Sequence, residues 1–224
     1  MKRFKFLSII MVIIIVILAI IPLFVSGCSD DIKITMSETE TFDSFSNAYV
    51  VMTGNKSWNA SRSSSMCNQL TSLGAQVEAS FYFGAYDIYR TFLYFDTSSI
   101  PEGARIKDVK LSIFLSGIMY NQDDVSIYVL SGNKEISYPA ICSDYNIAEY
   151  NDKVIGSIRF SDLSIGKYCD IELDNICIEN GGYTKLILLT DRDVDNIAPD
   201  GWNWITFMGI DSNYCPKLEV SYEK

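Results

Sequence analysis

Hydrophobic and polar residues alternate with a period of two through most of the chain after residue 90. In the run 109–115 the odd-numbered positions are aliphatic, and most even-numbered positions are polar. The same alternation occurs at residues 125–129, 169–173 and 217–222. Because successive side chains of a β-strand point to opposite faces, each run predicts a strand with one face in a core and the other toward water.

Two denser runs, residues 89–95 and 184–190, are apolar at odd and even positions alike. Such runs predict strands that are buried on both faces, inside a layered structure. Segments rich in Gly, Pro, Asn and Asp separate the strands, at residues 100–103, 121–124, 131–133 and 180–182. Many short strands between such turns predict an all-β fold, an antiparallel, jelly-roll-like β-sandwich, and a single helical turn is expected at residues 174–179.

The chain before residue 80 is less regular, and residues 55–70 are rich in Ser and Asn, which predicts a long surface loop. We expect residues 1–27 to be a signal peptide or membrane anchor. Residues 28–74 are expected to form an irregular segment that completes the sandwich, and residues 75–224 its core. The 197 residues that remain after residue 27 suit a single domain.

An export signal is predicted at the N-terminus. Three basic residues, Lys2, Arg3 and Lys5, precede an apolar run over residues 6–25, and Ser26-Gly27-Cys28 follows. This order matches a bacterial-type lipobox, with Cys28 as the lipid attachment point. A run of about twenty apolar residues is also long enough to span a bilayer uncleaved. In either case the rest of the chain is expected outside the cell, anchored to the outer face of the membrane.

Charge and composition exclude several classes of function. Beyond residue 27 the chain holds 15 basic and 28 acidic residues, so nucleic acid is not an expected partner. The chain contains no histidine, which excludes Ser-His-Asp catalysis and His-ligated metal sites. Carboxylate-pair chemistry of the glycosidase type remains open. Candidate carboxylates for it are Asp87, Asp96, Asp170, Glu172 and Asp211.

The cysteines after Cys28 are Cys67, Cys142, Cys169, Cys177 and Cys215. Outside the cell, five thiols allow as many as two disulfides, and the sequence does not give the pairing. The alternative is that some of them are buried as small hydrophobic residues.

One motif resembles a known family. It consists of residues 90–106, read as RTFLYFDTSSIPEGARI, followed by the strand at 109–115. The C-terminal residues 205–222 agree with it, since a short polar loop leads into the run Pro216-Lys217-Leu218-Glu219-Val220. Together these segments resemble the DNRLRE-domain family over residues 75–224. The resemblance implies a β-sandwich of the carbohydrate-binding-module type, a kind also found beside disaggregatase-type enzymes. The five cysteines and the Ser/Asn-rich segment depart from the family pattern.

The same motif has a physical interpretation. Pro101 fixes its own φ and Gly103 permits a turn, so the chain reverses between two strands. Asp96 is placed to accept backbone N–H groups of that turn, and Arg90 is expected to pair with an acidic residue. The motif can therefore be architectural without binding anything.

An acidic loop is a candidate calcium site. Asp191, Asp193 and Asp195 alternate along the chain, and Asp200 follows. Calcium takes six to eight oxygen ligands, of which such a loop can supply several. The alternative is a solvated acidic loop.

Exposed aromatic residues are candidates for a sugar-binding platform, because sugar rings have apolar faces. Trp202, on a loop bounded by Pro and Gly, is the first candidate, and Trp58, Tyr86 and Tyr183 are the others. The alternative for each is a place in the core.

We therefore expect a non-catalytic, surface-tethered β-sandwich that binds carbohydrate of a cell wall or extracellular matrix. The second hypothesis is a structural or adhesion protein whose partners are other surface proteins. The third is a carboxylate-dependent polysaccharide hydrolase or lyase.

Overall fold

The computed structural model describes residues 36–63, 68–70, 74–121, 125–132, 136–145, 154–210 and 213–224. The expected signal or anchor at residues 1–27 lies outside these residues, as do Cys28, Cys67 and Asp211. Met36–Lys224 form one compact unit. In this described part of the chain, no helix is long and apolar enough to cross a membrane.

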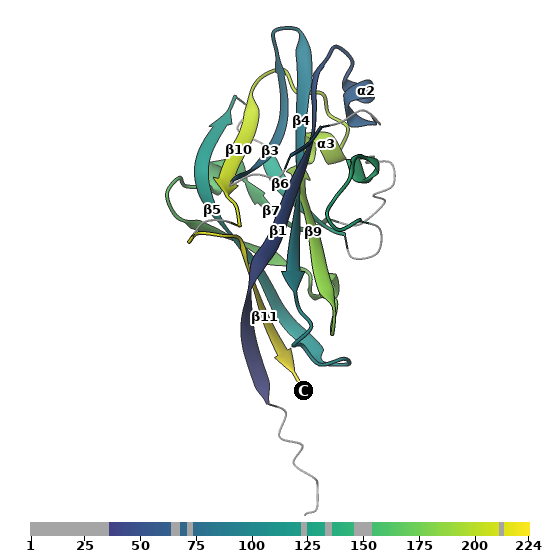
Figure 1. The fold of residues 1–224 in the computed structure, drawn as a ribbon. Coiled ribbons are helices and arrows are strands. Elements are labelled where there is room, and N and C mark those ends of the chain that lie inside the picture. Colours follow the sequence, from purple (N-terminus) through teal and green to yellow (C-terminus); the bar gives the residue numbers. More distant parts are fainter. Residues whose placement is uncertain are drawn as a thin grey trace, which may run out of the picture. The chain divides into compact units, whose positions relative to one another are not determined.

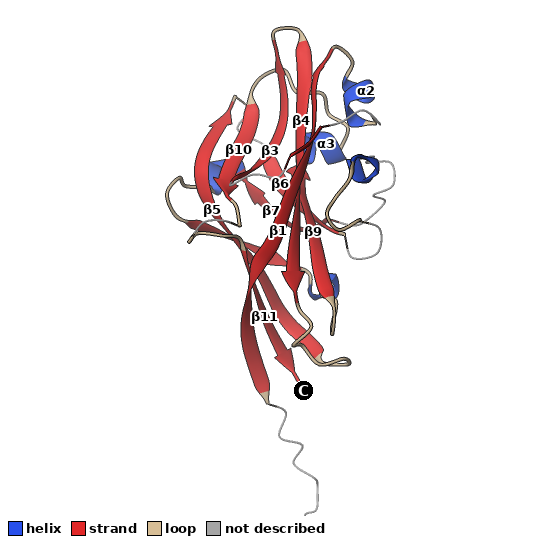
Figure 2. Cartoon of the chain, in the orientation of Figure 1, coloured by secondary structure: helices blue, strands red, loops and turns tan. Residues whose placement is uncertain are grey.

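Strands make up most of the described chain, and the helices are short (Figure 2). The strands are β1 (Ser37–Asn55), β2 (Asn68–Leu70), β3 (Gly74–Tyr82), β4 (Ala85–Asp96), β5 (Arg105–Tyr120), β6 (Ser126–Ser131), β7 (Val154–Arg159), β8 (Tyr168–Leu173), β9 (Tyr183–Thr190), β10 (Asn203–Met208) and β11 (Lys217–Glu223). The helices are α2 (Trp58–Arg62) and α3 (Asp191–Val194), with the 3-10 turns η1 (Cys142–Tyr145), η3 (Phe160–Asp162) and η4 (Asn175–Cys177).

Two long strands, β1 and β5, each pair with different partners along their length (Figure 1). The first part of β1 pairs with β11, and after an irregularity between Ser44 and Ser46 the strand pairs with β4. The first part of β5 lies between β11 and β8, and its second part pairs with β10. Strands that pass from one layer to another through such irregularities are typical of sandwiches with linked sheets.

These pairings join six strands into a ring, in the order β1, β4, β3, β10, β5 and β11. A second set of strands extends from β4 through β9 and β6 to β7. All of these pairings are antiparallel, as the alternation predicts. The fold is therefore all-β and sandwich-like, whereas its assignment as a jelly roll stays a prediction.

The main core lies on the inner faces of these strands. Its aliphatic and aromatic residues include Leu111 and Ile113 of β5, Leu93 and Phe95 of β4, and Val220 of β11. Over residues 109–115 of β5 the odd-numbered positions are buried and alternate with less buried positions, because successive side chains of a strand point to opposite faces. Burial of this apolar surface is the main source of stability of such a fold.

Two neighbouring strands, β4 and β9, are buried on both faces. Leu93 of β4 and Leu186 of β9 face the main core, whereas Phe92 and Ile187 face a second, outer core. The outer core is completed by residues from α2 and from the segment 136–145. The prediction that these two strands are apolar on both faces is confirmed. Their outer faces are apolar because α2 and the segment 136–145 cover them.

The period-two runs at 109–115, 125–129, 169–173 and 217–222 fall in β5, β6, β8 and β11, so these predictions are confirmed. The helical turn expected at 174–179 is present as η4. The expectation of irregular structure before residue 80 was wrong, because β1 and β3 lie there. The loop expected at 55–70 contains α2 and β2, and Ser57 caps α2 by accepting the N–H of Ala60.

The cysteines follow both expectations in part. Cys169, Cys177 and Cys215 are buried thiols outside any disulfide, as the alternative held. Burial raises the pKa of the Cys177 thiol to about 12, which keeps it protonated and unreactive. Cys142 is disulfide-bonded, although no disulfide joins two of the described residues.

This distribution predicts a pattern of thiol labelling. In denaturant without reductant, we expect Cys169, Cys177 and Cys215 to react with an alkylating agent and Cys142 to stay unmodified until reductant is added. Peptide mass mapping of the exported protein measures this directly. Alkylation of Cys142 before reduction would contradict the assignment.

Candidate functional site

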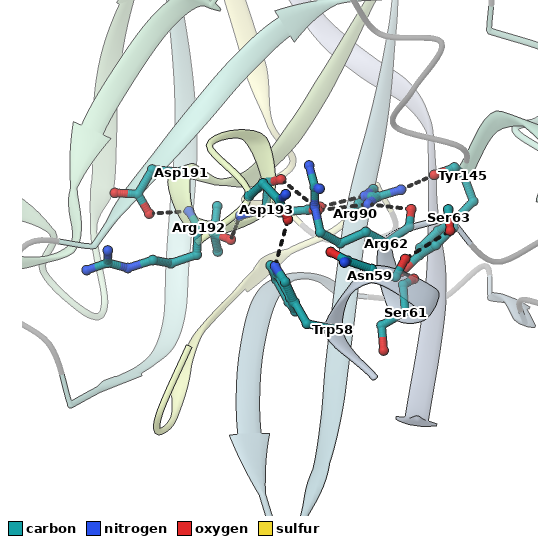
Figure 3. A network of polar contacts seen from close by, with 12 residues as sticks. Trp58, Asn59, Ser61, Arg62, Ser63, Arg90, Tyr145, Asp191, Arg192 and Asp193 are labelled. Atoms are coloured by element: carbon teal, nitrogen blue, oxygen red, sulfur yellow. Dashed lines mark hydrogen bonds and ion pairs between the residues drawn. The ribbon is translucent and has the colours of Figure 1, made fainter. Parts of the chain in front are cut away.

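A buried ion pair joins β4 to α3 (Figure 3). The Arg90 guanidinium donates to both carboxylate oxygens of Asp193, from Nε at 2.6 Å and from NH2 at 2.8 Å. Both side chains are fully buried. Arg90 also donates to the carbonyl oxygens of Tyr145 and Arg62, and its guanidinium lies 4.0 Å from the centre of the Tyr145 ring. The buried guanidinium of β4 thus has partners on three other elements, α2, η1 and α3.

Neighbouring contacts extend this network. Arg62 donates to the backbone carbonyl of Asp193 at 2.8 Å, and the Tyr145 hydroxyl donates to the carbonyl of Ser61 at 2.8 Å. The Trp58 indole N–H donates to Asn196 at 3.1 Å. The network fastens α2, η1 and α3 onto the outer face of β4, where they cover the outer core.

The residues considered for calcium do not converge. Asp193 is occupied by Arg90, and Asp191 accepts the N–H of Arg192 at 2.7 Å, while Asp195 is exposed. Desolvation raises the pKa of Asp191. Within the described ranges, no three His, Cys, Asp or Glu side chains gather as metal ligands, and Asp200 joins no such group. Thr190 instead caps α3 by accepting the N–H of Asp193.

The hairpin of β3 and β4 carries an exposed aromatic surface. Tyr82 pairs with Ala85, so the turn between them has two residues, Phe83 and Gly84, both at positive φ. A turn with both central residues at positive φ matches the twist of the hairpin strands. Phe83 is an unusual residue in this conformation, with φ at 51°, and the residue is 97 % exposed. The turn therefore exposes the large apolar ring of Phe83 to solvent.

Trp202 stacks on Tyr82, with ring centroids 4.6 Å apart and 12° between the planes. We call these two residues the Trp202–Tyr82 platform. Trp202 stays 36 % exposed. Its loop is fixed by backbone hydrogen bonds, since Asn121 donates to the Trp202 carbonyl and Phe81 to the Gly201 carbonyl, each at 2.9 Å.

Gly201 lies close to Asn121, so a larger residue there would have to displace the Asn121 side chain. A Cβ atom built on it would lie 2.6 Å from Nδ2 of Asn121, which is closer than real contacts allow. The Asn203 N–H donates to the Ser80 hydroxyl at 2.9 Å on the other side of the loop. Hydrogen bonds to β3 and to Asn121, the residue after β5, therefore hold the loop that carries Trp202.

Carboxylates lie beside the platform. The Tyr82 hydroxyl donates to Asp87, which also accepts the N–H of Gly54 at 2.8 Å. Glu78 lies on the same face of β3 as Tyr82 and is opposite Tyr89 and Trp204 on the neighbouring strands. The hydrogen bond to Asp87 raises the pKa of Tyr82.

Glu78 is a buried carboxyl group with a shifted pKa. Only 4 % of the residue is exposed, and desolvation raises its pKa to about 7. Hydrogen bonds from Ser80 and Gln76 oppose this shift, and the nearby charge of Asp87 adds to it. At neutral pH, Glu78 is therefore divided between its neutral and charged forms.

The four aromatic candidates from the sequence do not lie together. Trp58 is buried in the outer core, where its ring lies 5.4 Å from that of Tyr86. Tyr86 also packs on Phe81, away from Trp202. Tyr183 is exposed and 5.5 Å from Phe45 in a separate group.

That separate group, which we call the Tyr183 cluster, consists of Phe45, Tyr94, Tyr138 and Tyr183. Phe45 lies 5.4 Å from Tyr138, and Tyr94 lies 5.1 Å from Tyr138. Tyr94 is buried, whereas the other three rings are exposed. It is a second aromatic surface on β1, β9 and the segment 136–145.

The carboxylates considered for catalysis are dispersed. Asp87 lies near Glu78, whereas Asp96 ends β4 and accepts the Ser98 N–H at 3.1 Å. Asp170 and Glu172 share the outer face of β8, where Asp170 accepts the Ser112 hydroxyl at 2.6 Å.

The turn after β4 has the geometry that its residues suggest. Hydrogen bonds from Ser98 lower the pKa of Asp96. Ala104 donates to the carbonyl of Pro101 at 3.0 Å, and Gly103 has φ at 84°. These contacts give Asp96, Pro101 and Gly103 a role in chain reversal.

No protein-family model matches this chain, and no curated protein shows significant similarity to it.

Sequence reasoning missed Tyr82, Phe83 and Glu78 as parts of the Trp202 surface. The signal that was available is the two-residue link Phe83-Gly84 between two alternating runs, which is typical of a tight hairpin. The stacking of Tyr82 on Trp202 is not readable from sequence, because 120 residues separate the two rings.

The ion pair predicts a large effect of one substitution. Asp193→Ala leaves the Arg90 charge buried without its partner, so we expect a loss of about 3–5 kcal/mol in the free energy of unfolding. Urea denaturation measures this loss. As a matched control, exposed Asp195→Ala is expected to change stability by no more than about 0.5 kcal/mol.

A double variant, Arg90→Met with Asp193→Leu, is expected to regain most of the stability that Asp193→Ala loses. Equal stability of Asp193→Ala and the unmodified protein would show that the pair does not hold the fold.

Glu78 predicts a pH-dependent effect. Because its pKa is raised on folding, its contribution to stability is complete below about pH 4.5 and is lost as pH rises to about pH 7. Glu78→Gln removes this dependence. The measured quantity is the free energy of unfolding of Glu78→Gln minus that of the unmodified protein. This difference is expected to be larger at about pH 8 than at about pH 4, by up to about 3 kcal/mol, since each pKa unit corresponds to about 1.4 kcal/mol. Exposed Glu172→Gln is the control, and an equal difference at both pH values for Glu78→Gln would contradict the shift.

Proposed function

We propose that this chain is a non-catalytic, surface-tethered β-sandwich that binds carbohydrate of a cell wall or extracellular matrix through the Trp202–Tyr82 platform. The observation that carries the proposal is the stacked, partly exposed ring pair at the end of the β3–β4 hairpin. Exposed aromatic rings offer the flat apolar surface on which sugar rings stack, and nearby polar groups orient their hydroxyls. Phe83 extends this surface at the turn.

The sequence adds support of another kind. The lipobox at Cys28 supports export and anchoring at the outer face of the membrane, where wall polysaccharides are found. The resemblance of residues 75–224 to the DNRLRE-domain family supports carbohydrate binding as the role of the fold. The absence of histidine agrees with a binding module rather than an enzyme.

The rigidity of the site also supports binding. Hydrogen bonds hold the loop before β10 to β3 and to the end of β5. Few residues of this loop therefore need to become ordered when a ligand binds. A preorganised surface loses less conformational entropy on binding than a mobile one.

A structural or adhesion role is the second candidate, and the Tyr183 cluster favours it. Three exposed aromatic rings, Phe45, Tyr138 and Tyr183, lie together on one surface. Exposed apolar groups of this kind mark many protein contacts. In this role the cluster contacts another surface protein and no sugar binds.

Trp202→Ala tests the first candidate against the second. We expect the full-length protein in detergent to bind at least one wall or matrix polysaccharide on a glycan array, and Trp202→Ala to weaken that binding about tenfold or more. The expected loss corresponds to about 1.4 kcal/mol or more of ring stacking. Far-ultraviolet circular dichroism checks that the variant is folded.

Tyr183→Ala is the matched control, since it removes an exposed aromatic ring from the other cluster, and its sugar binding is expected to be unchanged. Binding that survives Trp202→Ala but is lost in Tyr183→Ala would move the site to the Tyr183 cluster. Absence of sugar binding combined with self-association would favour the structural role. Release of reducing ends from any polysaccharide would contradict a non-catalytic protein.

A further inference from the structure

The Trp202–Tyr82 platform differs from a neutral stacking surface because a carboxylate, that of Asp87, accepts a hydrogen bond from the Tyr82 hydroxyl. The Tyr82 hydroxyl donates to Asp87, and Tyr82 in turn stacks face to face on Trp202. A phenol that donates to a carboxylate gains electron density in its ring, because the proton is drawn toward the anion. The faces of Tyr and Trp rings already carry negative potential, and the indole attracts cations most strongly.

In β3, the Phe83-Gly84 turn, residues 197–202 and β10, the charged residues are all acidic. No lysine or arginine occurs in β3, in the Phe83-Gly84 turn, in residues 197–202 or in β10. Arg90 of β4 is fully buried against Asp193. Acidic residues nearby are Asp87 in β4 and Asp200 in the loop before Trp202, and the buried Glu78 of β3 is divided between its neutral and charged forms at neutral pH.

The rest of the molecule reinforces this local charge. The chain has a formal net charge of −10 at pH 7. A surface of one sign raises the local concentration of oppositely charged ligands and repels ligands of its own sign. Glycans that carry carboxylate, sulfate or phosphate groups are therefore disfavoured at this platform.

We infer that the platform selects glycans that carry free amines, such as polymers of de-N-acetylated hexosamine, over neutral and anionic glycans. This inference rests on the proposed carbohydrate binding and names the class of sugar that the same site takes. The sugar ring stacks on the Trp202 face, and its ammonium group lies over the polarised rings. Asp87 does not contact the sugar in this arrangement; it acts through the Tyr82 ring.

The test compares three oligosaccharides of equal length with the full-length protein in detergent. The probes are an oligomer of glucosamine, one of N-acetylglucosamine and one of galacturonic acid, at about pH 6, where free amines are protonated. Isothermal titration calorimetry is expected to give about three- to tenfold tighter binding of the glucosamine oligomer than of the N-acetylated one, as cation–π contacts of this kind provide. Galacturonate is expected not to bind.

Tyr82→Phe tests the role of the carboxylate, because it keeps the ring and removes the hydrogen bond to Asp87. We expect the preference for the free amine over the N-acetylated oligomer to fall by about two- to threefold. Tyr183→Phe is the matched control and is expected to leave this preference unchanged. Added salt is expected to weaken binding of the glucosamine oligomer alone.

The outcomes separate the two proposals. Equal affinity for the glucosamine and N-acetylated oligomers would overturn the selection of amines and leave carbohydrate binding intact. An unchanged preference in Tyr82→Phe would overturn the role of Asp87. Failure of all three probes, together with silence across wall polysaccharides, would overturn carbohydrate binding itself.

Discussion

The architecture depends on covering the outer face of β4, and the Arg90–Asp193 ion pair fixes that cover. β4 contributes apolar side chains to two cores, so neither of its faces can be left in water. Sheet pairing alone leaves the outer face exposed, and the short elements α2, η1 and α3 close it. Short helices have little stability of their own, because each turn orders several residues for few hydrogen bonds. A guanidinium with partners on all of these elements fixes where each one docks, whereas apolar contacts alone would allow sliding.

The strands that sequence patterns predict best are those with one constant environment. β8, β11 and residues 109–115 of β5 alternate because one face meets the core and the other is more exposed. β1 does not follow this rule. It changes partners from β11 to β4 near Ser44, and a register irregularity there inverts which side chains face inward. A single alternation pattern cannot describe a strand that serves two layers.

The candidate site shows a related limit. Trp202 was predicted from its local context, a tryptophan that directly follows Pro199-Asp200-Gly201. Its partner Tyr82, the carboxylate of Asp87 and the buried Glu78 come from β3 and β4, and only the pairing register brings them together. Asp193 illustrates the same point. Its neighbours in sequence suggest a metal loop, but the residue opposite it in space is an arginine 103 positions away.

The position of β1 has a mechanical consequence. Its first residue, Ser37, lies beside Glu223 near the C-terminus, and its last residue, Asn55, lies beside Tyr86 at the hairpin end of β4 (Figure 1). At about 3.3 Å per residue, the strand spans roughly 60 Å. If the chain is pulled from its N-terminal side while the hairpin end is held, the force runs along β1. The hydrogen bonds to β11 and β4 are then loaded together in shear rather than opened one after another, and a strand loaded in this way resists detachment far better than one that is peeled.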